Sequence, residues 1–307
     1  MKRGKAILVV GSIALDTIET PTELRKDLLG GSAVYFSLAG NFFSPIRLIG
    51  VIGEDMPADK LVPLRKKNID LKGKEKRKGR TFRWWGKYEK DFNQRRTVKL
   101  ELNVFRNFSP YLLHPYSQSP YLFLANIDPR LQRNILSQIR NKKLVGSDTM
   151  DHWIMDKPDE LISLLKEIDI FFLNEEEAKL FSQSSSIYKS AKWLMRKGPQ
   201  VVIIKRGEYG ALLLYRDRFF SCPAFPVEKV VDPTGAGDAF AGGFMGYLAR
   251  AKRRDENTFR CATVYGAIMG SFAVEAFGPA RFFALNFKEI KARVSLFKKI
   301  CNFDLSA

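Results

Sequence analysis

A glycine-containing turn between two regular elements constrains the fold of this chain more than any other feature. Val230 and Val231 are β-branched and predict the end of a strand, and an apolar run predicts a helix after the turn Asp232-Pro233-Thr234-Gly235-Ala236-Gly237-Asp238. Gly235 and Gly237 have no Cβ, so a ligand can approach the backbone closely. The N-terminus of a helix favours an anion, because its amides and its dipole both present positive charge.

Asp238 falls in the first turn of the predicted helix, where two interpretations are open. A carboxylate at this place is often only a helix cap. Beside an anion hole, it could instead take the proton of a substrate hydroxyl while the turn stabilises charge on a phosphoryl group. We favour the second interpretation.

The turn, continued by Ala239-Phe240-Ala241-Gly242-Gly243-Phe244, resembles the C-terminal motif of the ribokinase-like (PfkB) family of small-molecule kinases. The resemblance implies a three-layer α/β/α sandwich with a mainly parallel sheet and a small antiparallel β-lid. It also implies ATP and Mg²⁺ as cofactors, with Asp238 as the base and an anion hole made by Gly235, Ala236 and Gly237. No competing G-x-x-x-x-G-K-[ST] motif is present.

The N-terminal part supplies candidate substrate residues. In the family an Asp after the first strand binds substrate hydroxyls, and Asp16 follows the strand predicted over 6–13. Gly30 and Gly31 match a glycine pair that touches the substrate. The family usually has an Asn a few residues later, and this chain has Tyr35 there, so a particular sugar specificity cannot be transferred.

Two more candidate substrate residues follow the apolar run 120–125, namely Asn126 and Asp128. Ligands of open α/β folds bind at the carboxyl ends of the strands, where such polar side chains lie.

Nucleotide and metal positions come mainly from the resemblance. Asn174 and Glu177 match an Asn-x-x-Glu motif that assists Mg²⁺ and phosphate binding, with Glu177 acting through water. The alternative is that the acidic residues only offset a helix dipole.

Further along the chain, Lys205 and Gly207 belong to a strand-turn-strand unit on the nucleotide side, for which a plain hairpin is the alternative. Gly278 lies in the expected adenine loop. Asp232 and Thr234 match positions that often serve a monovalent cation such as K⁺.

The segment 80–105 alternates aromatic or β-branched residues with charges, a pattern typical of exposed antiparallel strands. It occupies the place of the family's lid, and 17–28 could join it. Trp84, Trp85 and Tyr88 could close over a sugar or a base, or pack on a second lid in a homodimer. Arg83, Arg95 and Arg96 could bind a phosphate of the substrate.

A length of 307 residues allows one large α/β domain with an inserted element, or two domains. The resemblance implies one kinase domain over 1–307, with the lid inserted at about 80–105. Three widely spaced cysteines indicate a reduced, cytoplasmic protein without a disulfide framework. No apolar run is long enough to predict a membrane span.

The formal charge is +18, and between Leu61 and Leu100 we count 15 Lys or Arg against 4 Asp or Glu. This segment could be a solvated face, attract an anionic substrate, or bind nucleic acid. We favour a small-molecule kinase over a nucleic-acid-binding protein, because Asp238, Asn174 and Glu177 are all present. Among acceptors we prefer a sugar or similar polyol, narrowly, over a nucleoside.

Overall fold

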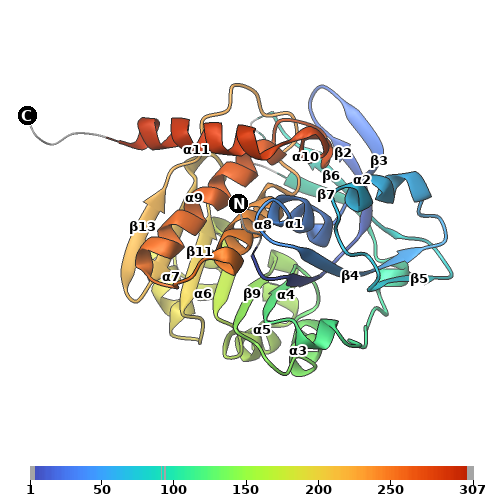
Figure 1. Cartoon of the computed structure of the whole chain (residues 1–307), viewed down its shortest axis with the longest axis horizontal. Coiled ribbons are helices and arrows are strands. Elements are labelled where there is room, and N and C mark those ends of the chain that lie inside the picture. Colours follow the sequence, from blue (N-terminus) through green and yellow to red (C-terminus); the bar gives the residue numbers. More distant parts are fainter. Residues whose placement is uncertain (1–3, 91, 93–94, 303–307) are drawn as a thin grey trace, which may run out of the picture.

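The computed structural model describes residues 4–90, 92 and 95–302, and its central feature is a nine-stranded sheet (Figure 1). Its strands are β1 (Ile7–Val10), β4 (Ile46–Gly53), β5 (Lys74–Arg77), β8 (Tyr121–Leu124), β9 (Leu144–Asp148), β10 (Ile170–Asn174), β11 (Val201–Lys205), β12 (Ala211–Tyr215) and β13 (Arg218–Cys222). They lie in the order β13-β12-β11-β10-β9-β8-β1-β4-β5. All neighbours from β5 to β11 are parallel, and β12 and β13 add an antiparallel edge.

Helices cover both faces of this sheet. One face packs against α1 (Ser32–Gly40), α2 (Val62–Lys66), α8 (Ala236–Arg250), α9 (Glu256–Ala273), α10 (Ala280–Ala284) and α11 (Phe287–Cys301). The other face packs against α3 (Pro129–Ser137), α4 (Asp151–Asp156), α5 (Pro158–Leu165), α6 (Glu175–Ser182) and α7 (Ile187–Met195). Successive side chains of β1 point to opposite faces of the sheet. Ile7 and Val9 pack into the core on the α1 and α8 side, and Leu8 and Val10 pack into the core on the α3 and α5 side. The three-layer sandwich is therefore confirmed.

A second sheet of four strands forms the lid, in the order β3-β2-β6-β7. Its strands are β2 (Ala14–Glu19), β3 (Leu24–Gly30), β6 (Phe82–Tyr88) and β7 (Arg95–Glu101). The segment 17–28 does belong to it. The lid is not wholly antiparallel, because β2 pairs with β6 in parallel. Each of these two strands follows a strand of the parallel sheet, β1 and β5, so both leave the core in the same direction.

Two local predictions were wrong. Val230 and Val231 do not form a strand, and the amide of Val231 donates instead to the carbonyl of Val274 at 2.8 Å. Pro223 and Pro226 follow β13 and lack the amide that a continued ladder needs. The basic amphipathic pattern of 61–69 also predicts a helix, but the α-helix there is only the five-residue α2, because Asn68 has a positive φ of 57° and ends it.

Glycines bring α1 and α8 into close contact. A Cβ added at Gly242 would lie 2.4 Å from the carbonyl oxygen of Phe36, and one at Gly246 would lie 2.9 Å from that of Gly40. The two helices run in the same direction, since early residues of one contact early residues of the other. Their N-termini therefore meet at one edge of the sheet, beneath the lid.

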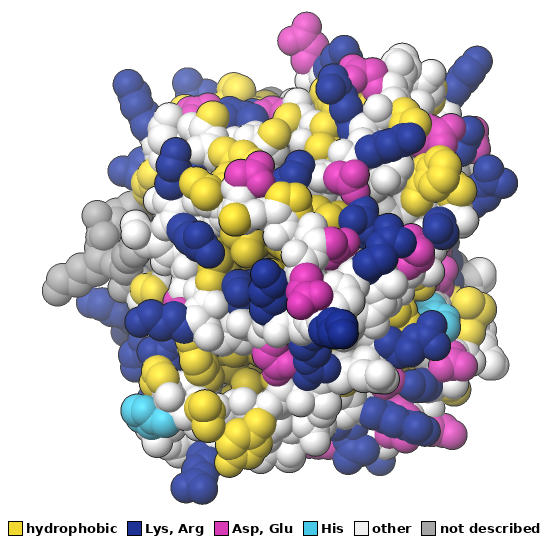
Figure 2. All heavy atoms as spheres, turned by 90° about the vertical axis from the view of Figure 1, so that its right-hand side faces the viewer, with side chains coloured by type: hydrophobic (Ala, Val, Ile, Leu, Met, Phe, Trp, Pro, Cys, Tyr) yellow, Lys and Arg dark blue, Asp and Glu magenta, His cyan; other side chains and the backbone are white. Residues whose placement is uncertain are grey.

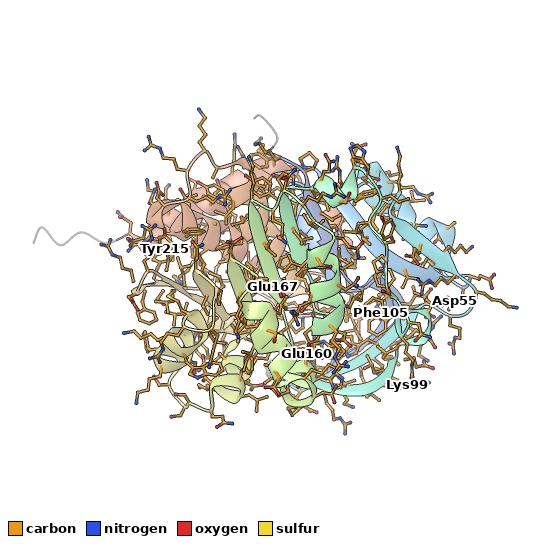
Figure 3. The ribbon with its side chains drawn as sticks, turned by 90° about the horizontal axis from the view of Figure 1, so that it is seen from below. Asp55, Lys99, Phe105, Glu160, Glu167 and Tyr215 are labelled. Carbon is orange, nitrogen blue, oxygen red and sulfur yellow. The ribbon has the colours of Figure 1, made fainter. Side chains whose placement is uncertain are left out.

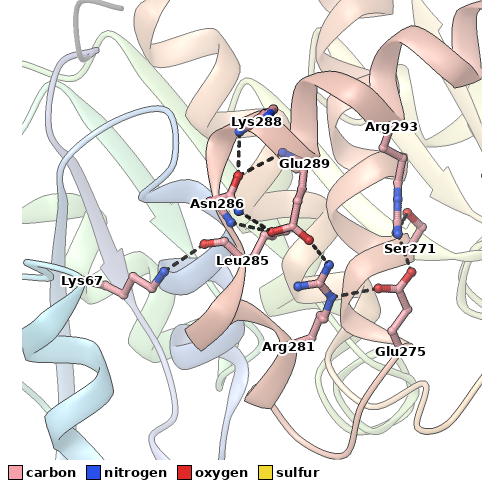
Figure 4. Close-up of polar contacts among 9 residues, drawn as sticks. All are labelled: Lys67, Ser271, Glu275, Arg281, Leu285, Asn286, Lys288, Glu289 and Arg293. Atoms are coloured by element: carbon pink, nitrogen blue, oxygen red, sulfur yellow. Dashed lines mark hydrogen bonds and ion pairs between the residues drawn. The ribbon is translucent and has the colours of Figure 1, made fainter.

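The C-terminal helix is tied down by charged side chains (Figure 4). Arg293 donates to the Ser271 hydroxyl at 3.0 Å and pairs with Glu275. Arg281 pairs with Glu275 at 3.0 Å and also with Glu289. This network holds α10 and α11 on α9. Within the part of the chain that the structure describes, no helix has the length and apolar character to cross a membrane.

The basic segment 61–100 is interleaved with acidic partners rather than uniformly positive. Arg83 pairs with Asp55 at 2.9 Å and with Asp27, and Lys87 pairs with Glu19 at 2.5 Å. Figure 2 shows Lys and Arg side chains spread over the lid end with Asp and Glu among them. Figure 3 places Asp55 and Lys99 at this end of the molecule and Tyr215 at the other.

We expect Gly242→Ala to destabilise the protein, because the added methyl group would overlap the Phe36 carbonyl and force α1 and α8 apart. The expected loss is about 1–3 kcal/mol of the free energy of unfolding, measured by chemical denaturation. Gly270→Ala is the matched control in α9, where the nearest atom would lie at 3.3 Å and the helix gains propensity. Equal effects of the two substitutions would contradict the close helix contact.

Candidate active site

The candidate site lies at the carboxyl edge of the parallel sheet, where the turn 232–235 begins α8. Gly235 is the N-cap of α8 with a φ of +75°, a conformation that favours glycine. The amide of Ala236 already donates to the Pro233 carbonyl at 3.2 Å. Helix geometry leaves the next first-turn amides, those of Gly237 and Asp238, without an intrahelical acceptor. These amides are available to an anion.

Lys205 supplies a positive charge beside this turn. A Cβ added at Gly237 would lie 3.2 Å from its Nζ, so the absent side chain leaves room for a small group between them. Nζ donates to Asp148 at 2.6 Å, and the side chains of Lys205 and Asp148 are only 16% and 4% exposed. Burial lowers the pKa of Lys205, but the charges of Asp148 and Glu177 outweigh it and the net pKa is raised. Lys205 therefore stays charged.

Asp238 lies next to this ion pair and is partly buried in the first turn of α8. Desolvation and then the charge of Asp148 raise its pKa to about 7, against the opposing charges of Lys205 and Arg95. A carboxyl with such a pKa is poised to accept a proton near neutral pH.

Asp16 is the second carboxyl of the site, 3% exposed on lid strand β2. It lies against Gly30, where an added Cβ would be 1.8 Å from Oδ2. Burial and then the charge of Asp232 raise its pKa to about 8, opposed by a hydrogen bond from the Gly31 amide. The structure thus brings Asp16, Gly30 and Gly31 together, and their binding of a substrate stays a prediction.

Asn174 and Glu177 form a capping box at the start of α6. Asn174 Oδ1 accepts the Glu177 amide at 2.8 Å, and Glu177 Oε2 accepts the Asn174 amide at 2.7 Å. Burial raises the pKa of Glu177 to about 7, although Lys205 opposes this shift. Both residues lie at the end of β10, and Asn174 is paired in register with Lys205. Their capping role is visible, and a role toward Mg²⁺ stays a prediction.

Asp232 ties the turn to the loop at Gly278. It is fully buried, and its two oxygens accept the amides of Thr234 and Gly278, both at 2.8 Å. The described residues contain no cluster of three or more His, Cys, Asp or Glu that could hold a metal ion. A cation at Asp232 and Thr234 would have to share oxygens that already accept amides.

The remaining predicted residues are held by other contacts. Asn126 accepts a hydrogen bond from Trp153 Nε1 at 3.0 Å. Asp128 caps α3 by accepting the Arg130 amide at 2.9 Å, and it pairs with Lys157. Gly207, with a φ of 56°, makes the turn between β11 and β12. The structure does not bring Asn126 and Asp128 into hydrogen-bonding contact with Asp16 or Asp238.

The lid closes over the turn through residues that the sequence did not single out for this contact. Tyr88 on β6 shares a hydrogen bond of 2.9 Å with the Thr234 hydroxyl. Arg95 on β7 lowers the pKa values of Asp238 and Glu177, and lies 5.6 Å from the ring of Trp84. Trp84 is paired in register with Asp16 in parallel strands, so both side chains lie on one face of the lid.

Two site residues, Asp148 and Tyr35, were not predicted as candidates, and the contact made by a third, Tyr88, was not foreseen. Asp148 forms an ion pair with Lys205 that spans 57 positions of the chain. Tyr88 was assigned to the lid, and its contact with Thr234 depends on how the lid folds back. Tyr35 was noted only as a departure from the family.

The residues present suit a nucleotide phosphate. The cradle at Gly237 would be filled by a Cβ, and it lies between Lys205 and the open amides of α8. A charged amine and backbone donors are the groups that bind phosphate.

Comparison with known proteins agrees with this geometry. Residues 7–278 match the family described as pfkB family carbohydrate kinase. The chain is 28% identical over 259 residues to a cytidine kinase of Thermococcus kodakarensis. This alignment covers 81% of this chain and 91% of that protein. Its fold is similar to the crystal structure of a Methanocaldococcus jannaschii nucleoside kinase, with a TM-score of 0.76, 20% identity and coverage of 96% and 100%.

A putative ribokinase II from E. coli, solved in complex with ATP and Mg²⁺, is similarly related, with a TM-score of 0.76 at 19% identity, covering 95% of this chain and 99% of that one. The family match spans most of the chain and its motifs lie together in one site. The chain therefore belongs to the PfkB family of carbohydrate kinases, which are phosphotransferases with an alcohol group as acceptor.

Proposed function

We propose that this chain transfers the γ-phosphate of ATP to a hydroxyl of a nucleoside, with Asp238 as the general base. The observation that carries the proposal is the placement of Asp238 beside both the open amides of α8 and Lys205. A base and an anion hole in the first turn of α8, with the Lys205 cation from β11 beside them, are the groups that phosphoryl transfer to an alcohol requires.

Each residue of the site would have a separate role in phosphoryl transfer. Asp238 would take the proton of the acceptor hydroxyl, and Asp16 would orient the acceptor by accepting from another hydroxyl. Lys205 and the amides of Gly237 and Asp238 would stabilise negative charge on the transferred group. ATP with Mg²⁺ supplies the phosphoryl group and neutralises part of its charge when bound.

Metal-assisting roles are part of the proposal. Glu177 and Asn174 would bind Mg²⁺ through water, using the atoms that the capping box leaves over, and Asp148 adds a further carboxylate beside them. K⁺ at Asp232 and Thr234 remains a candidate. The lid would exclude water from the site, which limits hydrolysis of ATP.

The lid favours a nucleoside as acceptor over the free sugar or polyol that the sequence favoured. Trp84 presents an aromatic ring beside Asp16 on the same lid face, so a sugar held by Asp16 would bring an attached base toward that ring. The cytidine kinase relative aligns over most of both chains and supports the same class. The nucleic-acid alternative loses some support, because two basic side chains of the lid, Arg83 and Lys87, are paired with acidic ones.

The first test is incubation with Mg²⁺ and ATP and a panel of nucleosides, free sugars, sugar phosphates and polyols, with phosphorylated products detected by mass spectrometry. Cytidine and other ribonucleosides should give the main products. Trp84→Ala should raise KM for a nucleoside by about 5- to 100-fold, because base stacking on an aromatic ring contributes about 1–3 kcal/mol. Trp85→Ala is the matched control, since its side chain lies on the opposite face of β6. Exclusive phosphorylation of free sugars would contradict the nucleoside assignment.

Asp238→Asn should lower kcat by about 10²- to 10⁴-fold, the usual contribution of a general base. The folded-state pKa of Asp238 lies above its ordinary value of 3.8, so stability falls as pH rises from about 4 through about 7. Asn removes this penalty, and the melting temperature should not fall at pH 8. A kcat close to wild type in a folded variant would refute the role of Asp238.

The pH profile provides a separate test. Because Asp238 must be ionised and its pKa is raised to about 7, kcat/KM should decline as pH falls below about 7. Asp148→Asn removes a negative charge that contributes to this shift, so the acidic limb should move to lower pH, whatever the maximal rate. Asp156→Asn, an exposed position on α4, should leave the limb in place. An unchanged limb in Asp148→Asn would argue against the coupling between the two carboxyls.

A further inference from the structure

We propose that the hydroxyl of Tyr35 binds a second hydroxyl of the acceptor and so makes Tyr35 a specificity-determining residue. The inference rests on the proposed function, because it concerns the acceptor that Asp238 activates. It concerns a residue that none of the contacts described above requires for phosphoryl transfer.

The ring of Tyr35 is fixed against the anion-hole turn. Tyr35 lies on α1, its side chain is only 1% exposed, and its ring covers Gly235. A Cβ added at Gly235 would lie 2.3–2.4 Å from three atoms of that ring. Gly235 is therefore glycine both for its positive φ and for this contact. Because the ring cannot swing away without moving the turn, the direction of its hydroxyl is set by the fold.

The Tyr35 hydroxyl is buried and has no hydrogen-bond partner among the described residues. Buried polar groups are nearly always paired, so an unpaired hydroxyl in a site indicates a partner that arrives with the ligand. Tyr88 provides the contrast, because its hydroxyl bonds the Thr234 hydroxyl at 2.9 Å on the same turn. Two tyrosines thus flank the turn, and only one of them is satisfied.

The groups around Tyr35 define which atom would complete the contact. The charges of Asp232, Asp16 and Asp238 act on its hydroxyl and, after burial, contribute to raising its pKa, so it remains a donor. Asp232 already accepts two amides, whereas Asp16 accepts one, from Gly31. A neutral hydroxyl can accept from Tyr35 and donate to Asp16 at once. An anionic oxygen would be repelled by the carboxylates, and a hydrogen in place of the hydroxyl would leave both partners unpaired.

The expected ligand group is therefore a hydroxyl on a carbon near the one that carries the reacting alcohol. A ribose offers such groups at its 2′ and 3′ positions. Discrimination by this pair of contacts should be large, because a site built to hydrogen-bond a hydroxyl rejects the analogue that lacks it.

The test measures kcat/KM of wild type and Tyr35→Phe with cytidine, 2′-deoxycytidine and 3′-deoxycytidine. Phe keeps the ring on Gly235 and removes only the hydroxyl, so the melting temperature should be unchanged or higher. With cytidine, Tyr35→Phe should lose about 10- to 100-fold, the effect of removing one bond to a substrate hydroxyl. With one of the two deoxy analogues, wild type and variant should be equal, because the partner of Tyr35 is absent from that substrate.

One control variant and the wild-type enzyme separate the possible results. Tyr188→Phe, at a position 53% exposed on α7, should match wild type with all three substrates. An equal loss with all three substrates in Tyr35→Phe, or no loss with any, would overturn the inference while leaving the kinase activity established. If wild type phosphorylated none of the three, the proposed nucleoside function would fail, and this inference would fail with it.

Discussion

The close contact between α1 and α8 determines where every other part of the site can lie. Helices normally keep side chains between their axes, but here Gly242 and Gly246 let the backbone of α8 meet that of α1 directly. This contact aligns the two N-termini, one carrying Gly31 and the other Gly235. The lid strand with Asp16 and the turn with Asp238 are consequently held near each other, so that the charge of Asp238 acts on Asp16.

The buried carboxyls of this site are unfavourable for folding when no ligand is bound. Asp16, Asp148, Glu177 and Asp238 all have raised pKa values because burial disfavours their charged forms. Among the described residues, Lys205 is a buried cation beside these carboxyls. Arg95 on β7 adds positive charge from the lid. Such an excess of buried carboxyls reduces folding stability near neutral pH. It also means that a metal cation arriving with a phosphate ligand would be stabilised by the same carboxyls.

The sequence was informative where chemistry depends on neighbours in the chain. The turn 232–238, the glycine pair at 30–31 and the pair Asn174 and Glu177 are local patterns, and the first two lie at the N-termini of α8 and α1. The parallel sheet also followed from short apolar runs between helical segments. The ends of strands were predicted less well. The β-branched residues at 230–231 suggested a strand, but Pro223 and Pro226 before them lack the amides that a continued ladder needs.

Contacts between distant segments could not be predicted. Asp148 meets Lys205 only because β9, β10 and β11 are neighbours in the sheet, which no spacing in the sequence encodes. Tyr35 was read as a substitution within a motif, whereas its importance lies in the ring that covers Gly235. The parallel pairing within the lid likewise depends on the directions in which β1 and β5 leave the core.

The lid is built from two separate segments of the chain, β2 with β3 and β6 with β7. This arrangement bears on how the substrate of the enzyme could change. Asp16 and Trp84 come from β2 and β6, whereas Asp148, Lys205 and Asp238 come from the core. Under the proposed function, recognition of the acceptor and transfer of phosphate would therefore lie on separate sheets. Substitutions on the inner face of the lid would then alter the molecule that is accepted and leave Asp148, Lys205 and Asp238 in place.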